Sequence, residues 1–158
     1  MLDVIFALKF VHVLAAAAMF GVWLCLATMM LLGHRSGNPS VVAVTAQFVV
    51  TVEKTVMIAA VALQPIAGFP LGWAIGLSFG EFWIVWSIAI YAITVACWLA
   101  AFLIEIRIRR LSRQAALHAV PLPQQYRGLF QLWSVLASAV LISITATLGL
   151  MVWQPRLD

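Results

Sequence analysis

The chain has 158 residues, of which 65% are hydrophobic and only 9% are charged. Soluble domains carry about 25% charged residues, so a water-exposed globule of this size is excluded. Disorder is excluded as well, because disordered chains combine low hydrophobicity with high charge. The composition therefore predicts a small integral membrane protein whose main partner is the lipid bilayer.

Four apolar runs are each long enough to cross a membrane, since a bilayer core of about 30 Å needs about 20 helical residues. They are continuous rather than alternating, which argues against a barrel of strands. We therefore expect an all-α, up-down four-helix bundle, with residues 1–158 forming a single transmembrane domain. The predicted spans cover about residues 4–32, 55–77, 82–104 and 129–153.

The basic residues concentrate in two of the connections between spans. Residues 33–54 contain Arg35 and Lys54, and residues 106–128 contain five of the seven arginines. The positive-inside rule places both connections in the cytoplasm, and hence both termini outside, in a bacterial inner membrane. The arginine cluster lies between two apolar runs rather than on a solvated basic face, so we expect no nucleic-acid partner.

Local signals predict that the second and third helices continue beyond the membrane. Asn38 and Pro39 are typical of a helix start. Glu105 and Arg109 are four residues apart, which is a favourable ion-pair spacing on a continuing helix. The cytoplasmic face is therefore expected to be helical and basic.

The second span contains residues that disturb a helix, and we expect a kink between Gln64 and Gly72. Pro65 and Pro70 each remove a backbone donor and clash with the preceding turn. Broken membrane helices often line a binding site, but the simpler interpretation, which we favour, is a packing kink beside small residues.

Polar side chains inside the spans are the main candidates for a functional site. Lys9 and His12 are three residues apart and share a helix face. Counting about 1.5 Å per residue places His12 too deep for its ring to reach water easily, whereas Lys9 can extend to the interface. The same counting predicts a polar layer of His12, Tyr91 and Thr145 in the outer half, with Gln64 below it.

Three roles are open for His12: an interhelical hydrogen bond, an axial ligand of haem b, or a proton relay or substrate contact. His34 and His118 lie in the opposite connections, so a bis-histidine haem site is excluded. A single-histidine haem remains allowed, with Met19 or Met151 as a weak second ligand.

The acidic residues number five and all lie at or near span ends, so we expect no buried carboxylate pair. Glu53 and Lys54 are interpreted as boundary residues, and His34 and Arg35 as ordinary interface charges. We find no catalytic motif and no metal-binding motif.

Three segments together resemble a bacterial family of four-helix predicted integral membrane proteins without an assigned function. They are L-K-F-V-H-V at 8–13, P-L-P-Q-Q-Y-R at 121–127 and L-M-V-W-Q-P at 150–155. The first helix is also distantly similar to those of HemJ-type protoporphyrinogen oxidases and copper-resistance D-type proteins. The likeness to HemJ-type proteins implies that His12 binds haem. It covers one helix, so it implies no enzymatic activity.

These observations leave three functional hypotheses. The first is a structural or accessory membrane bundle. The second is a haem-b or quinone-linked redox membrane protein that uses His12, with Lys9 beside it. The third is a transporter of a small solute or metal, which would be a homo-oligomer or work with a membrane protein partner, because one four-helix bundle offers little room for a pathway.

Overall fold

The computed structural model describes residues 2–155, and all the regular secondary structure within them is helical. Four helices are long and apolar enough to cross a membrane, which confirms the predicted four-helix membrane bundle. The second of them is continuous from Pro39 to Ala74 and comprises three elements. The elements are α1 (Leu2–Arg35), α2 (Pro39–Val52), η1 (Glu53–Met57), α3 (Ile58–Ala74), α4 (Phe82–Leu117) and α5 (Gln124–Trp153).

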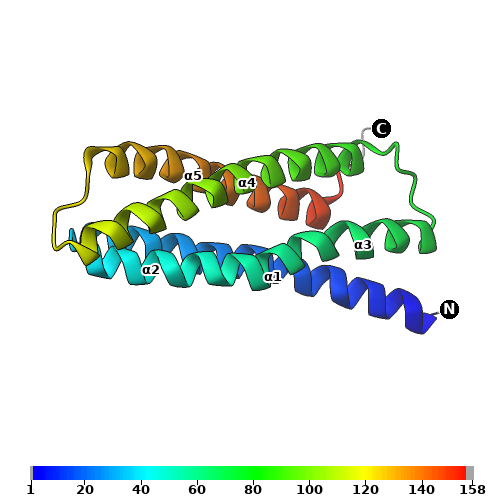
Figure 1. Cartoon of the computed structure of the whole chain (residues 1–158). Helices are drawn as coiled ribbons and strands as arrows, with labels where there is room; N and C mark the ends of the chain where they lie inside the picture. Colours follow the sequence, from blue (N-terminus) through cyan, green and yellow to red (C-terminus); the bar gives the residue numbers. More distant parts are fainter. Residues whose placement is uncertain (1, 156–158) are drawn as a thin grey trace.

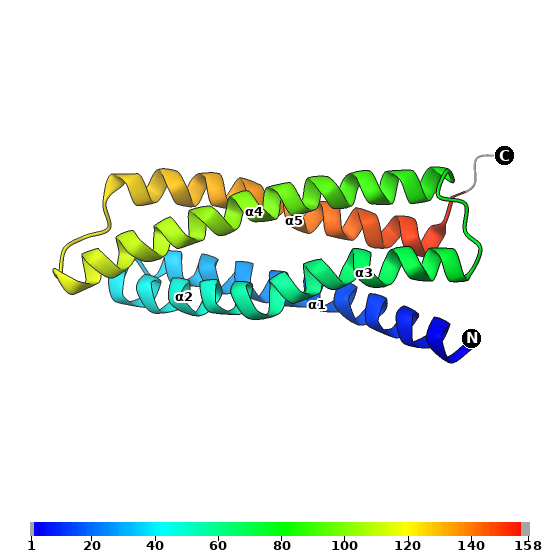
Figure 2. The same ribbon diagram turned by 45° about the vertical axis from the view of Figure 1, so that its right-hand side comes forward.

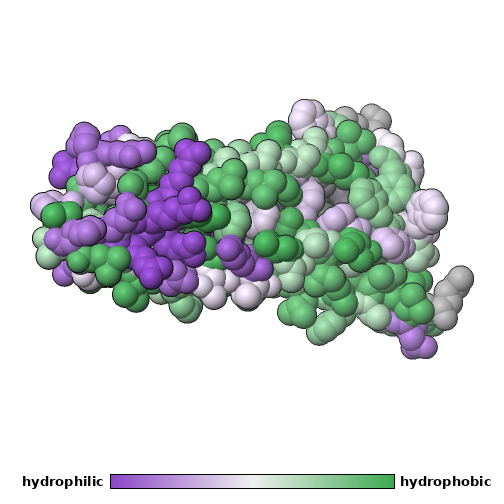
Figure 3. Space-filling view, viewed as in Figure 1, coloured by the Kyte–Doolittle hydropathy of each residue, from purple (hydrophilic) through white to green (hydrophobic). Residues whose placement is uncertain are grey.

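The helices run alternately up and down, as expected from the short connections. The start of α1, the α3–α4 turn and the end of α5 lie at one end of the molecule, which we call the terminal end (Figure 1). The α1–α2 and α4–α5 connections lie at the other, called the basic end because most arginines are near it. Hydrophilic residues gather over the half nearest the basic end, whereas the terminal half is mostly hydrophobic (Figure 3).

The second and third membrane helices extend beyond the predicted spans, as the sequence indicates. The side chain of Asn38 accepts a hydrogen bond from the Ser40 N–H at 2.9 Å and caps α2, with Pro39 in the first turn. The third membrane helix, α4, likewise continues past Ile104, the end of its predicted span, to Leu117. Much of the two connections between spans is therefore ordered helix.

The second span contains an irregularity that its two prolines do not account for. Helix α3 continues through Pro65 and Pro70. Instead, η1 is a π-helical turn in which the Ile58 N–H bonds the carbonyl oxygen of Glu53, five residues earlier. A π turn holds an extra residue and therefore rotates the helix face that follows it. Before this turn α2 packs on both α4 and α1, whereas after it α3 packs on α1 and barely contacts α4.

The hydrophobic core is best developed in the middle and basic half of the bundle. Trp23 of α1, Ala46 of α2, Ile108 of α4 and Val140 of α5 are all essentially inaccessible there. In the terminal half the helices form two pairs, α1 with α3 and α4 with α5, and α3 barely contacts α4 or α5. Figures 1 and 2 show this division from two directions.

Candidate functional site

Two carboxyl groups are buried in the bundle core, which corrects the expectation that no such pair exists. Glu53 is 0% exposed and Glu105 is 1% exposed. The interpretation of Glu53 as a boundary residue is wrong, because the π turn directs its side chain into the core. Its neighbour Lys54, interpreted in the same way, is exposed. The helices extend past the predicted spans, so a residue at a span end is still inside the protein.

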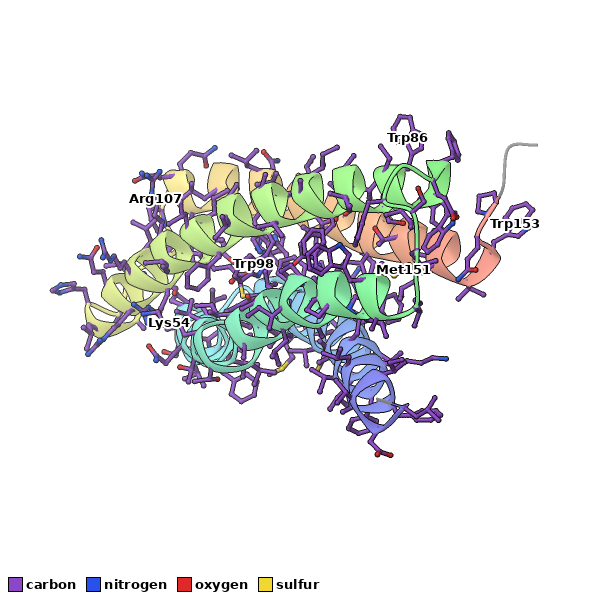
Figure 4. All side chains as sticks on the ribbon, turned by 90° about the vertical axis from the view of Figure 1, so that its right-hand side faces the viewer. Lys54, Trp86, Trp98, Arg107, Met151 and Trp153 are labelled. Carbon is purple, nitrogen blue, oxygen red and sulfur yellow. The ribbon has the colours of Figure 1, made fainter. Side chains whose placement is uncertain are left out.

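Each buried carboxyl group accepts one hydrogen bond from a tryptophan indole. The Trp98 Nε1–H donates to Glu53 Oε2 at 2.6 Å, and the Trp133 Nε1–H donates to Glu105 Oε1 at 2.8 Å. The remaining oxygens, Glu53 Oε1 and Glu105 Oε2, are buried without a hydrogen-bond partner. Figure 4, viewed from the terminal end, shows Trp98 inside the bundle and Arg107 on its outer surface. The two glutamates and the two tryptophans that bond them are called the Glu–Trp centre below.

The predicted ion pair between Glu105 and Arg109 does not form. Arg109 instead lies 3.5 Å from the side-chain oxygen of Gln47, on the surface between α2 and α4. Burying an isolated carboxylate is very costly, and a group without a cation binds a proton instead. Burial therefore favours the neutral form of both carboxyl groups in the Glu–Trp centre.

A weak signal of this centre is present in the sequence. Trp98 and Glu105 are seven residues apart and so lie on one helix face, two turns from each other. Their partners Glu53 and Trp133 come from other helices, and the pairing depends on the π turn and on how the helices cross. No spacing within one segment indicates it.

The predicted site residue His12 lies between α1 and α3. Its Nδ1 is 3.1 Å from the backbone oxygen of Gln64, so Nδ1 carries the proton and donates. Gly68 allows this approach, because a Cβ there would be 2.9 Å from His12 Cε1. His12 therefore ties two helices, and the ring nitrogen Nε2 remains free to accept a hydrogen bond or bind a ligand.

Tyr91 is close to this layer and bonds the same helix. Its hydroxyl donates to the Val61 backbone oxygen at 2.6 Å. That oxygen would normally accept from the N–H of residue 65, but Pro65 has none. Tyr91 thus satisfies the acceptor that the proline leaves open, and the proline pattern does mark a polar position.

The other predicted members of the layer are placed differently. Gln64 is level with His12 rather than below it, and its Oε1 is buried without a partner. Thr145 is exposed and bonds the Leu141 carbonyl of its own helix, so it does not join the others. Lys9 is exposed on α1.

A further polar pair, missed from the sequence, lies one turn of α4 from Trp98. The Thr94 hydroxyl is 2.8 Å from the Ser143 hydroxyl of α5, and Thr94 is buried. On α4, Tyr91, Thr94, Trp98 and Glu105 share one face, at spacings of three, four and seven residues. They form a polar line of about 21 Å along the bundle interior at 1.5 Å per residue.

His34 is also more than an ordinary interface charge. Its Nδ1 is 3.0 Å from the Tyr126 hydroxyl, and its ring stacks on Phe130 with a centroid distance of 3.7 Å. Phe130 in turn packs against Trp133 at 5.3 Å. The histidine thus joins the end of α1 to the aromatic side of the Glu–Trp centre.

Within residues 2–155, no group of three or more His, Cys, Asp or Glu side chains is arranged to hold a metal ion. A shallow apolar groove of about 380 Å³ lies between α1 and α3 at the terminal end. Val11 and Ala67 line its inner part, next to His12 and Gly68 in the chain.

The family profile of predicted integral membrane proteins DUF2269 matches residues 6–155. The chain belongs to this family. The match confirms the suspected membership and agrees with the four membrane-crossing helices. No curated protein matches the chain, and no solved structure matches it. DUF2269 is described only as a predicted integral membrane protein, so any specific role must be argued from the residues above.

Proposed function

We propose that this DUF2269 protein relays protons through the interior of its helical bundle. The observation that carries the proposal is the Glu–Trp centre, with two fully buried carboxyl groups that each keep one oxygen without a partner. Ionisable groups buried in a protein interior are costly, and those that face the interior of a membrane bundle mark proton relays or ion pathways.

The chemistry of the centre suits proton transfer. In each pair the indole N–H occupies one carboxyl oxygen and holds the group in a defined orientation. The other oxygen carries the proton and is free to pass it on, since no protein group holds it. Buried water can occupy such sites where polar groups lack partners.

The polar line on α4 provides the direction of the relay. The proposed path starts at Glu105 and continues to Glu53, which is bonded to Trp98 of α4. It then follows the Thr94–Ser143 pair and ends at Tyr91. Beyond Tyr91 lie Gln64 and His12 in the terminal half. This arrangement supports a path along the bundle axis rather than toward the lipid.

Proton flux into proteoliposomes tests the proposal. The protein is reconstituted with a pH-sensitive dye inside, and a potassium diffusion potential drives protons inward. We expect dye acidification faster than in empty vesicles, and Glu105→Gln or Glu53→Gln should return the rate to that of empty vesicles. Glu81→Gln is the matched control, because Glu81 also accepts an indole N–H, from Trp83 at 2.7 Å, but is only half-buried.

Two results would contradict the relay. One is a wild-type rate equal to that of empty vesicles. The other is a rate that both core variants leave unchanged. A carbonyl stretching band of protonated carboxylic acid in the infrared spectrum, weakened in Glu105→Gln and in Glu53→Gln and kept in Glu81→Gln, would report the bound protons separately from their movement.

A second candidate is that His12 binds haem b, which would supply one-electron redox chemistry. The donated Nδ1 proton leaves Nε2 as the ligating atom, and metal-ligating histidines commonly donate their other nitrogen to a carbonyl. The only other histidines in residues 2–155 are distant: His34 is stacked on Phe130 at the basic end and His118 follows α4. The residues therefore fit a single-histidine site.

An absorption spectrum of protein expressed with ample haem tests this candidate. A Soret band that His12→Ala abolishes and His118→Ala preserves would support it. A colourless protein would remove it and leave the relay, or failing that a purely structural bundle, as the role.

We also propose that the basic end faces the cytoplasm of a cell whose inner membrane holds the protein. Seven of the nine Lys and Arg residues lie in the two connections 33–54 and 106–128. In a background without Cys25 and Cys97, a cysteine at exposed Gln114 should resist an impermeant reagent added to intact cells. Rapid labelling there would reverse the orientation. Whether the protein forms a homo-oligomer or has a membrane protein partner stays a prediction.

A further inference from the structure

The terminal half of the bundle is divided into two helix pairs that are tied unequally. Inside the first pair, His12 bonds α3 and its ring fills the space above Gly68, which holds α1 and α3 together. Inside the second, the Thr94–Ser143 bond joins α4 to α5. Between the pairs, α3 barely contacts α4 or α5 (Figure 2).

Within residues 2–155, one side-chain hydrogen bond joins α3 to the α4–α5 pair, from Tyr91 to the Val61 oxygen. Its acceptor is available only because Pro65 lacks an N–H. The bond from Trp23 to the Ala137 oxygen, 3.3 Å long, joins α1 to α5 beyond the middle of α1, toward the basic end. The terminal ends of the two pairs are therefore weakly connected.

The division begins at the π turn. Up to Val52 the second membrane helix packs on both α4 and α1, and from Ile58 it keeps α1 but barely contacts α4. Helical hydrogen bonds to the fifth residue are rare and are frequently found at functional sites. Glu53 opens this turn and is bonded to Trp98 of α4, so the buried carboxyl lies where the two pairs separate.

We propose that α1 and α3 swing as one unit away from α4 and α5, with η1 as the hinge, and so open a lateral passage from the terminal end to Glu53. The proposal rests on the proposed relay for its purpose, because the passage would give protons from the terminal side access to Glu53. The turn 75–81 links α3 to α4 and would have to extend during the swing. Apart from this turn, few contacts and one side-chain hydrogen bond oppose the movement, so this part of the bundle opens at the lowest cost.

Distances between spin labels test the swing in the full chain in lipid bilayers. Trp73 of α3 and Trp86 of α4 are 82% and 50% exposed and accept labels without disturbing the core. In a background without native cysteines, pulsed electron paramagnetic resonance should give two populations for the 73–86 pair. A control pair at Trp86 and Val152, across α4 and α5, should give one narrow distance.

Tyr91→Phe removes the tie and should raise the ratio of long to short 73–86 distances about threefold, the equivalent of one average interhelical hydrogen bond in a membrane. Tyr126→Phe is the matched control, since it removes the bond to His34 at the basic end and should leave the ratio unchanged.

A single narrow 73–86 distance in the labelled protein that keeps Tyr91 would overturn the hinge. This result does not depend on a variant that could fail to fold. Equal ratios in Tyr91→Phe and Tyr126→Phe would overturn the role of the tie. Two populations together with a proton flux equal to that of empty vesicles would keep the hinge and remove the relay. If both the hinge and the relay are correct, cross-linking cysteines at positions 73 and 86 should reduce the proton flux.

Discussion

Replacement of Gly68 by alanine tests the packing of the His12 layer. The added Cβ would lie 2.9 Å from His12 Cε1 and 3.1 Å from Nδ1, closer than carbon atoms tolerate. The ring must shift, and the bond to the Gln64 oxygen is lost with it. Overpacking costs about 1–3 kcal/mol. The lost interhelical bond adds about 0.6 kcal/mol in a membrane protein. The preference of a helix for alanine over glycine offsets about 0.5–1 kcal/mol of this, so we expect a net loss of roughly 1–3 kcal/mol in the free energy of unfolding.

The assay is unfolding in mixed micelles with increasing denaturing detergent. Gly21→Ala is the matched control, because Gly21 is on α1, is exposed, and has nothing within 4 Å of the position that a Cβ would occupy. Alanine is favoured over glycine in a helix interior by roughly 0.5–1 kcal/mol, so the control should be neutral or stabilising. The same substitution is thus expected to have opposite signs at the two positions.

A double variant identifies His12 as the cause of the loss. With His12→Ala the ring is absent and the new methyl group has room, so the two losses should fall short of additivity by about 0.5–3 kcal/mol. Strict additivity, or equal effects at Gly68 and Gly21, would refute the reasoning, because the loss in the free energy of unfolding would then have a cause other than the His12 ring.

Further predictions concern the tryptophan and tyrosine bonds. Trp98→Phe leaves both oxygens of Glu53 without a partner, which should lower the free energy of unfolding by about 1–3 kcal/mol in addition to the cost of the smaller ring. Trp83→Phe should lower it less, because water can reach Glu81. Both tryptophans are buried, so the two losses can be compared directly, and equal losses would contradict the prediction. Tyr126→Phe should cost about 0.6 kcal/mol in the same assay, through the bond to His34, and no loss would mean that the bond is not formed.

Part of the candidate site follows from sequence patterns. The deep placement of His12 and the proline-disturbed second span both indicate polar positions in the terminal half. The structure brings His12 and Gln64 together and adds Tyr91 through the carbonyl that Pro65 leaves open. Depth counting fails for Thr145 because it gives the level of a residue and not the face that it occupies.

The Glu–Trp centre shows where sequence reasoning stops. Acids at span ends suggest the membrane boundary, but the protein continues as packed helix beyond that boundary. Glu53 enters the core through a π turn, and Glu105 meets Trp133 of another helix. Both facts depend on helix faces and crossings.

The sequence by itself determines the solvent of this protein and the number of its crossings. Lipid cannot satisfy backbone groups, so any apolar run of sufficient length must be a helix. Tertiary structure alone decides which side chains meet, because one extra residue in a turn rotates every face after it. Here the second span loses its packing on α4 after that turn, and Glu53 lies in the core where the helix pairs separate.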